Sequence, residues 1–294
     1  MGRKKSLFYG SATAIVTPFS GGQVDYLAFS ELIDFQLANG TDAIVILGTT
    51  GEAPTVYENE RQEIISFARR KTKGKVPLIV GTGSNATSVA VRYTKNAEAL
   101  GADGCLVVSP YYNKATTKGL TEHYKAIAKS VKIPIIIYNV PARTGVNIPL
   151  DVYEKLCKIE NIVGIKEASG SISYTQELIA KYGDYFSVYA GCDELTLPTL
   201  SLGGQGVISV VSNIVPSHMH QLCAEYRGGN FQKAQELQLY LSPLVKEMFS
   251  EVNPIPIKTA LYQMGLCKNE FRLPMCTSTR QRQINASLKK YNLV

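Results

Sequence analysis

The chain has 294 residues, of which 45% are hydrophobic and 19% are charged, and its formal net charge is +7. This composition is typical of a soluble globular protein, and no apolar run approaches the roughly 18 residues that a membrane helix requires. The basic residues are dispersed without interleaved aromatic residues, so we expect no nucleic-acid or membrane partner and a preference for acidic small substrates.

The six cysteines are scattered singly, with no CxxC pair and no histidine at metal-ligand spacing. This pattern argues against a disulfide framework or a metal site and favours a reducing cytosol. The first six residues fit a loose myristoylation pattern through Gly2 and Ser6, and their basic residues could begin a signal peptide. Because a short strand broken by Pro18 follows in place of a long apolar run, we expect neither, and we expect a cytoplasmic location.

Short apolar strands alternate with amphipathic helices along the chain. The predicted strands span residues 13–16, 42–47, 78–81, 104–108, 135–139, 163–166, 187–190 and 207–211. The predicted helices span residues 26–38, 58–71, 88–100, 120–131, 150–159, 172–182, 194–202 and 217–226. The strands are apolar on both faces, as parallel strands covered by helices are. Eight such units without a long linker predict an α/β fold, the (β/α)8 TIM barrel.

Three further helices are predicted after the eighth unit, beginning near residues 231, 254 and 277. No low-complexity segment separates them from the barrel. The sequence therefore predicts a catalytic barrel over residues 1–230 and a C-terminal helical extension over residues 231–294 that packs on it.

Polar motifs follow four of the predicted strands. On a (β/α)8 barrel the reactive residues lie at the carboxyl ends of the strands. The motifs are Gly-Thr-Thr-Gly-Glu at 48–52, Ser-Pro-Tyr-Tyr-Asn at 109–113, Tyr-Asn-Val-Pro-Ala-Arg-Thr-Gly at 138–145, and a lysine at 166. We therefore expect one active site, built from these loops.

Lys166 stands near the end of an apolar strand. Burial makes an ammonium costly, lowers its pKa and leaves a neutral, nucleophilic amine, which is what imine formation with a carbonyl requires. Since alternate residues share a face of a strand, Gly164 and Lys166 are expected to point into the barrel and Ile165 toward the helices. Taken alone, Lys166 could also reach solvent from the strand end.

The first, third and fourth motifs carry a resemblance. Gly-Thr-Thr-Gly-Glu, Tyr-Asn-Val-Pro-Ala-Arg-Thr-Gly and Gly-Ile-Lys-Glu-Ala, in that order, resemble the dihydrodipicolinate synthases, which belong with N-acetylneuraminate lyase to the pyruvate-dependent class I aldolases. The resemblance extends from Gly10 to the C-terminal helices. It implies condensation of pyruvate with L-aspartate 4-semialdehyde in lysine and diaminopimelate biosynthesis, with a covalent imine at Lys166 and no cofactor or metal.

The resemblance also implies catalytic roles. Lys166 matches the imine-forming lysine, and Tyr138 matches the tyrosine that shuttles protons during imine formation and ring closure. Thr49 matches the relay between Tyr138 and Tyr112, and Tyr112 matches a tyrosine that reaches in from a neighbouring subunit. A homo-oligomer is therefore implied, a tetramer built as a dimer of dimers.

Four positions match substrate-binding residues. Thr50 would hold the pyruvate carboxylate, and Arg143 would bind the carboxylate of the semialdehyde, for which a planar guanidinium suits better than an ammonium. Gly191 and Ile208 match positions that contact substrate through backbone groups. Arg143 separates the synthases from the sugar-acid lyases.

Synthases that lysine inhibits usually carry a glutamate for the lysine amine, where this chain has Val89, and often a histidine, where it has Glu58; Arg61 is a further departure. The sequence therefore predicts weak or absent feedback by lysine.

Two alternatives to the synthase remain open. One is a related pyruvate aldolase acting on a sugar or hydroxy-acid aldehyde, which Arg143 disfavours. The other is a catalytically silent barrel that binds a keto acid, which the joint presence of Lys166, Tyr138 and Thr49 disfavours. Contact of Cys105 or Cys192 with the site stays undecided, and the three histidines are expected to have surface or capping roles.

Overall fold

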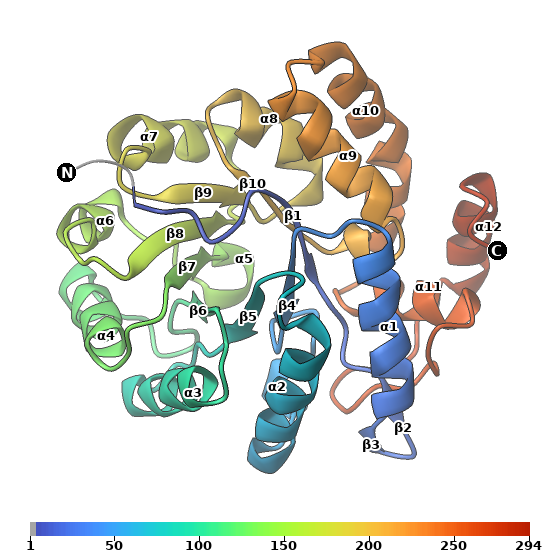
Figure 1. The fold of residues 1–294 in the computed structure, drawn as a ribbon, viewed down its shortest axis with the longest axis horizontal. Helices are drawn as coiled ribbons and strands as arrows, with labels where there is room; N and C mark the ends of the chain where they lie inside the picture. Colours follow the sequence, from blue (N-terminus) through green and yellow to red (C-terminus); the bar gives the residue numbers. More distant parts are fainter. Residues whose placement is uncertain (1–3) are drawn as a thin grey trace.

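The computed structural model describes residues 4–294 and closes eight parallel strands into a barrel (Figure 1). The strands are β1 (Gly10–Ala14), β4 (Ala43–Ile46), β5 (Leu78–Gly81), β6 (Gly104–Val108), β7 (Ile135–Asn139), β8 (Ile162–Glu167), β9 (Ser187–Ala190) and β10 (Gly206–Ser209). Neighbouring strands pair in chain order, and β10 pairs with β1 to close the ring. The predicted (β/α)8 barrel is thereby confirmed. Gly2 of the possible myristoylation pattern lies outside the described residues.

Eight helices cover the barrel in the predicted order. They are α1 (Tyr26–Ala38), α2 (Glu58–Thr72), α3 (Thr87–Ala99), α4 (Thr117–Lys129), α6 (Leu150–Leu156), α7 (Ile172–Tyr182), α8 (Thr196–Ser201) and α9 (Pro216–Arg227). Side-chain caps fix several starts, since Asp25 accepts from the Ala28 N–H and Ser171 accepts from the Tyr174 N–H. No helix within residues 4–294 is long and apolar enough to cross a membrane.

Short elements that the sequence pattern did not predict stand in the loops. They are the hairpin of β2 (Phe19–Ser20) and β3 (Gln23–Val24), the helix α5 (Pro141–Thr144), and the 3-10 turns η1 (Ala53–Thr55), η2 (Asp193–Leu195) and η3 (Val211–Asn213). Pro141 begins α5 and Gly145 ends it in the left-handed region, with φ of +71°.

The bounds of the first and last strands were predicted wrongly. β1 begins at Gly10, three residues before the expected start, and β10 ends at Ser209 because Val211 already belongs to η3. At the seam, a Cβ on Gly206 would lie 1.9 Å from the carbonyl oxygen of Gly10. The two strands can meet there only because residue 206 has no side chain.

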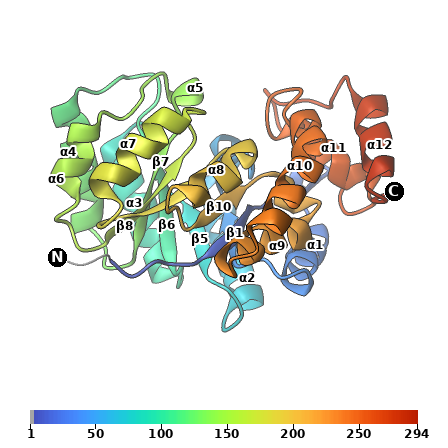
Figure 2. The same cartoon turned by 90° about the horizontal axis from the view of Figure 1, so that it is seen from above.

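The C-terminal helices are α10 (Phe231–Met248), α11 (Ile255–Gln263) and α12 (Gln281–Lys290). Figures 1 and 2 place them beside α9 and α1, on the far side of the molecule from α4 and α6. Their apolar side chains join the same core that lies between the barrel and its helices. The division into a barrel over residues 1–230 and an extension over 231–294 stays a prediction.

Two apolar cores follow from the alternation of side chains along the strands. The outer core fills the space between strands and helices and includes Ile165 and Ile137. The inner core fills the barrel and includes Ile136, Tyr138 and Tyr189. The site described next lies where the inner core meets the loops at the carboxyl ends of the strands.

Candidate active site

Lys166 points into the barrel, as predicted. Its strand β8 pairs with β7 so that Lys166 stands opposite Tyr138, and its Nζ lies 4.5 Å from the centre of the Tyr138 ring. Only 5% of Lys166 is exposed. Gly164, two residues earlier, makes room in the interior, because a Cβ there would lie 3.2 Å from the Tyr189 ring.

The surroundings of Lys166 shift its amine toward the neutral form. Burial lowers its pKa from the ordinary value to about 8, and the nearby carboxylate of Asp193 opposes part of that shift. Asp193 is itself buried, and its Oδ2 accepts from the backbone N–H groups of Val210 and Val211 at 3.1 and 3.0 Å. An amine in this state can act as a nucleophile near neutral pH. Burial raises the pKa of Asp193, while its hydrogen bonds to the backbone N–H groups lower it in part, which favours the carboxylate that can balance a cationic intermediate.

Two adjoining cavities open at this end of the barrel. The inner one, of about 230 Å³, has Lys166 on its wall together with Thr49, Thr50, Tyr138 and Arg143. The outer one, of about 310 Å³, shares Thr49, Tyr138 and Arg143 with it but does not reach Lys166. The loops after β4 and β7 and the ends of β7 and β8 thus bring together five of the predicted site residues: Thr49, Thr50, Tyr138, Arg143 and Lys166.

Tyr138 is held in its protonated form. Burial raises its pKa to about 12, while the Arg143 charge and a hydrogen bond with the Thr49 side chain lower it in part. A phenol in this state can donate a proton and recover it through a hydrogen-bonded neighbour. The structure therefore brings the predicted pair of Tyr138 and Thr49 into contact beside Lys166.

Thr50 and Arg143 are joined through a residue that the sequence analysis did not single out. The Nδ2 of Asn253 donates to Oγ1 of Thr50 at 3.0 Å, and the Arg143 Nη2 donates to the backbone oxygen of Asn253 at 2.9 Å. Asn253 lines both cavities. It belongs to the segment between α10 and α11 and carries no motif, so no sequence signal pointed to it.

Gly191 and Ile208 occupy different positions relative to the cavities. Gly191 lines the inner cavity, and a Cβ there would lie 2.6 Å from Cβ of Ala168 and 3.1 Å from Cε of Lys166. Ile208 is fully buried in the inner core and does not line either cavity. Val210, two residues further along, stands on the cavity wall in its place.

Tyr112 is not brought to this site within one chain. Its side chain is 93% exposed, it lines neither cavity, and its φ of +70° places it in the left-handed region, which is uncommon for a bulky residue. A tyrosine held outward in this way is available to another molecule and cannot act on Lys166 of its own chain in this conformation.

Of the two cysteines near strand ends, one contacts the site. Cys192 lines the inner cavity, whereas Cys105 is buried in the outer core on β6. Burial raises the pKa of both thiols to about 12, so neither is a thiolate near neutral pH. The expectation for His123 was wrong, because it is 5% exposed and its Nδ1 lies 2.9 Å from Oγ1 of Thr87.

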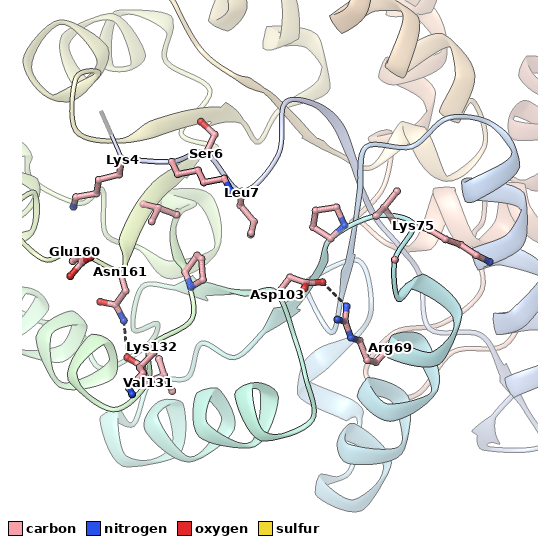
Figure 3. A pocket seen from close by; sticks show the side chains of 16 residues that line it. Lys4, Ser6, Leu7, Arg69, Lys75, Asp103, Val131, Lys132, Glu160 and Asn161 are labelled. Atoms are coloured by element: carbon pink, nitrogen blue, oxygen red, sulfur yellow. Dashed lines mark hydrogen bonds and ion pairs between the residues drawn. The ribbon is translucent and has the colours of Figure 1, made fainter. Parts of the chain in front are cut away.

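A larger depression, of about 1120 Å³, lies at the opposite end of the barrel, where the segments leading into β1, β5, β6, β7 and β8 meet (Figure 3). Two of its cations are already engaged. The Lys4 Nζ donates to the carbonyl oxygens of Ile159 and Ile162 at 2.5 and 2.8 Å, and Arg69 forms an ion pair with Asp103 at 2.8 Å. Lys166, Tyr138 and Arg143 lie at the other end of the barrel, at the carboxyl ends of the strands.

No cluster of three or more metal-ligating side chains occurs within residues 4–294. The inner cavity offers instead an amine, a phenol, two hydroxyls and a guanidinium. These groups can form an imine, move protons and bind carboxylates.

Comparison with known proteins agrees with this set of groups. A model of the Dihydrodipicolinate synthetase family matches residues 7–290. The 4-hydroxy-tetrahydrodipicolinate synthase of Alkaliphilus oremlandii is 46% identical over 98% of this chain and 100% of its own length. The crystal structure of dihydrodipicolinate synthase from Aquifex aeolicus superposes with a TM-score of 0.95, at 46% identity, over 97% of this chain and 99% of that one.

A third relative has been crystallised with a ligand. The chloride-inhibited dihydrodipicolinate synthase from Acinetobacter baumannii, complexed with pyruvate, superposes with a TM-score of 0.95. It is 41% identical, and the match covers 97% of this chain and 99% of that one. With the family match spanning nearly the whole length, the chain belongs to the dihydrodipicolinate synthetase family.

Proposed function

We propose that this protein is a 4-hydroxy-tetrahydrodipicolinate synthase, a lyase that condenses pyruvate with L-aspartate 4-semialdehyde through an imine on Lys166. The observation that carries the chemistry is the buried Lys166 amine, whose pKa is lowered to about 8, on the wall of a cavity that also holds Tyr138. A binding protein for a keto acid has no need of such an amine.

In the first half of the reaction, the neutral Lys166 amine attacks the C2 carbonyl of pyruvate. Tyr138 protonates the departing hydroxyl, water leaves, and a cationic imine forms. Loss of a proton from the methyl group then gives an enamine, because the iminium nitrogen accepts the electron pair. The Asp193 carboxylate, buried nearby, stabilises the positive charge of the imine.

In the second half, the enamine carbon attacks the aldehyde carbon of the semialdehyde, and the resulting alkoxide takes a proton from the Tyr138 and Thr49 relay. The amine of the semialdehyde portion then attacks the imine carbon. That attack closes the ring. The ring nitrogen loses a proton and the Lys166 nitrogen gains one, the bond to Lys166 breaks as the ring C=N forms, and 4-hydroxy-tetrahydrodipicolinate is released. Every proton is supplied and recovered by side chains or solvent, so the cycle requires no external cofactor or metal.

Thr50 and Arg143 hold the two carboxylates. Thr50 lies on the inner cavity with Lys166 and is 2% exposed, which suits it to the pyruvate carboxylate. Arg143 lies on both cavities and binds the carboxylate of the semialdehyde that enters after pyruvate. In the same proposal Gly191 contacts substrate through its backbone, while Ile208, which was expected to do the same, lines neither cavity and is given no substrate contact.

Tyr112 completes the proton relay from a neighbouring copy of the chain. Its exposure and outward backbone conformation support this assignment, which requires a homo-oligomer, a tetramer built from two dimers. Each dimer would then contain two complete sites.

The first test measures pyruvate consumption with three aldehydes: L-aspartate 4-semialdehyde, N-acetylmannosamine and a short aldehyde without a carboxylate. We expect turnover with the semialdehyde alone. Turnover with another aldehyde would favour a related aldolase. A parallel sample with pyruvate and borohydride should gain a covalent adduct on Lys166, and a protein with neither adduct nor turnover would be a silent binder.

A further inference from the structure

Asn253 connects the C-terminal extension to the pyruvate pocket. It is 7% exposed and stands 203 residues from Thr50 in the chain, yet its Nδ2 donates to the Thr50 hydroxyl at 3.0 Å. The remaining atom of its amide, Oδ1, is buried and has no hydrogen-bond partner within residues 4–294. A buried polar side chain with one unsatisfied atom is costly, which indicates that the position serves the cavity more than the core.

The direction of this hydrogen bond determines where the Thr50 proton points. A hydroxyl group has one hydrogen to donate and two lone pairs that accept. Because Asn253 donates to Oγ1, one lone pair is occupied by the amide, and the hydroxyl hydrogen is directed away from it. Thr50 lines the inner cavity together with Lys166, so a ligand there is an acceptor for the hydrogen that Asn253 leaves free.

We infer that Asn253 is a positioning residue, which orients the Thr50 hydroxyl so that its hydrogen is donated to the carboxylate of the bound keto acid. This inference rests on the proposed function, in which Thr50 holds pyruvate. An isolated threonine hydroxyl would rotate among several partners, and fixing it in advance removes that loss of freedom from the binding step.

An ion pair also holds the segment that carries Asn253 against the loop that carries Thr50. Lys258, on α11, forms an ion pair of 2.7 Å with Glu52, two residues after Thr50, and the side chains are 0% and 1% exposed. The same segment is tied to the other carboxylate-binding residue, since the Asn253 backbone oxygen accepts from Arg143 at 2.9 Å. Through Asn253 the C-terminal extension therefore fixes the two carboxylate-binding residues relative to each other.

The test measures the pyruvate concentration at which half of the protein is trapped by borohydride, with no aldehyde present. Asn253→Ala should raise this midpoint about three- to tenfold, the effect of losing one hydrogen bond. Asn253→Asp should raise it further, because its carboxylate accepts the Thr50 hydroxyl hydrogen and repels the keto acid. Thr50→Val should raise the midpoint, and adding Asn253→Ala to it should change little more.

Asn230→Ala is the matched control. It removes the asparagine that caps α10, just before the extension begins, which lines neither cavity, and it should leave the midpoint unchanged. An unchanged midpoint in Asn253→Ala would overturn the inference, as would an effect of equal size with and without Thr50→Val. If Asn253→Ala does not fold, the pyruvate midpoint of the isosteric Asn253→Asp is compared with that of the wild-type protein instead. An unchanged midpoint in that variant would also overturn the inference.

The outcome is separable from a failure of the proposed function. Trapping uses pyruvate alone, so it is independent of which aldehyde the protein accepts. A wild-type protein that forms no adduct would contradict the imine itself, whereas a normal wild-type midpoint with an unaffected Asn253→Ala contradicts only the role of Asn253.

Discussion

The Lys258 ammonium and the Glu52 carboxylate meet at 2.7 Å in a part of the molecule from which solvent is almost completely excluded. The Lys258 Nζ also lies 4.2 Å from the centre of the Phe19 ring and 5.0 Å from that of Phe271. Burial lowers the pKa of Lys258, and the Glu52 charge opposes that shift. The pair therefore joins α11 to the loop that carries Thr49 and Thr50.

Replacing Lys258 with methionine should destabilise the protein by about 3–5 kcal/mol, because Glu52 is then a buried charge without a partner. Thermal or urea unfolding measures the loss. Adding Glu52→Gln should restore part of it, since no lone charge remains. Lys181→Met, which breaks the exposed pair with Glu177, should cost less than about 1 kcal/mol. Equal losses in the two single variants would contradict this account.

The rate of imine formation should depend on pH through Lys166. Its pKa of about 8 leaves roughly half of the amine neutral at pH 8, whereas an ordinary lysine is below about 1% neutral there. The neutral amine is the nucleophile, so the rate of adduct formation with pyruvate should rise about tenfold from pH 6 to pH 7 and level off above pH 8.

Asp193→Asn provides a check on that profile. The Asp193 carboxylate raises the pKa of Lys166, so its removal should lower that pKa and move the midpoint of the profile to lower pH. A midpoint near the ordinary lysine value in the wild-type protein would show that Lys166 is not desolvated in solution.

Two inactive variants should restore activity when mixed. Tyr112→Phe should lose most activity while keeping its fold, and Lys166→Ala should lose all of it. If Tyr112 serves a neighbouring subunit, a mixed dimer contains one complete site. Random reassociation should therefore return about a quarter of the wild-type activity. No recovery in a sample proven to contain mixed dimers, or full activity of Tyr112→Phe alone, would remove the relay.

Lysine should inhibit the protein weakly or not at all. Val89 offers no carboxylate for a lysine amine. The Arg61 guanidinium is committed to the Gly81 backbone oxygen at 2.7 Å and stacks on the Tyr93 ring at 4.3 Å. Steady-state turnover measured across a lysine series, with Val89→Glu as the comparison, tests this. Inhibition of the wild-type protein by submillimolar lysine would contradict the prediction.

The barrel could be predicted because its strands are dense in apolar, β-branched residues. Residues 78–81, 104–108, 135–139 and 187–190 form strands with the predicted bounds. The ends of the barrel seam could not be placed, because Gly10 and Gly206 have no side-chain pattern and are selected by the contact between two backbones.

The site was predictable where it lies in short motifs and not where it depends on long-range packing. Five of the predicted residues end or follow strands, and a parallel barrel brings such positions together. They are Lys166, Tyr138, Thr49, Thr50 and Arg143. Asn253 comes from outside the eight units, so no local pattern marks it. Ile208 lies in the inner core and does not reach the cavity, because β10 ends at Ser209. The alternation of side chains along a strand does not determine where that strand ends.

The two cavities differ in which of the key side chains they reach. Lys166 stands only on the inner one, while exposed Arg143 stands on both. Only a molecule in the inner cavity contacts the amine, whereas Arg143 can be reached from either cavity. A keto acid joined to Lys166 therefore occupies the inner cavity, while a carboxylate held by Arg143 can extend into the outer one, so the two cavities leave room for both substrates side by side.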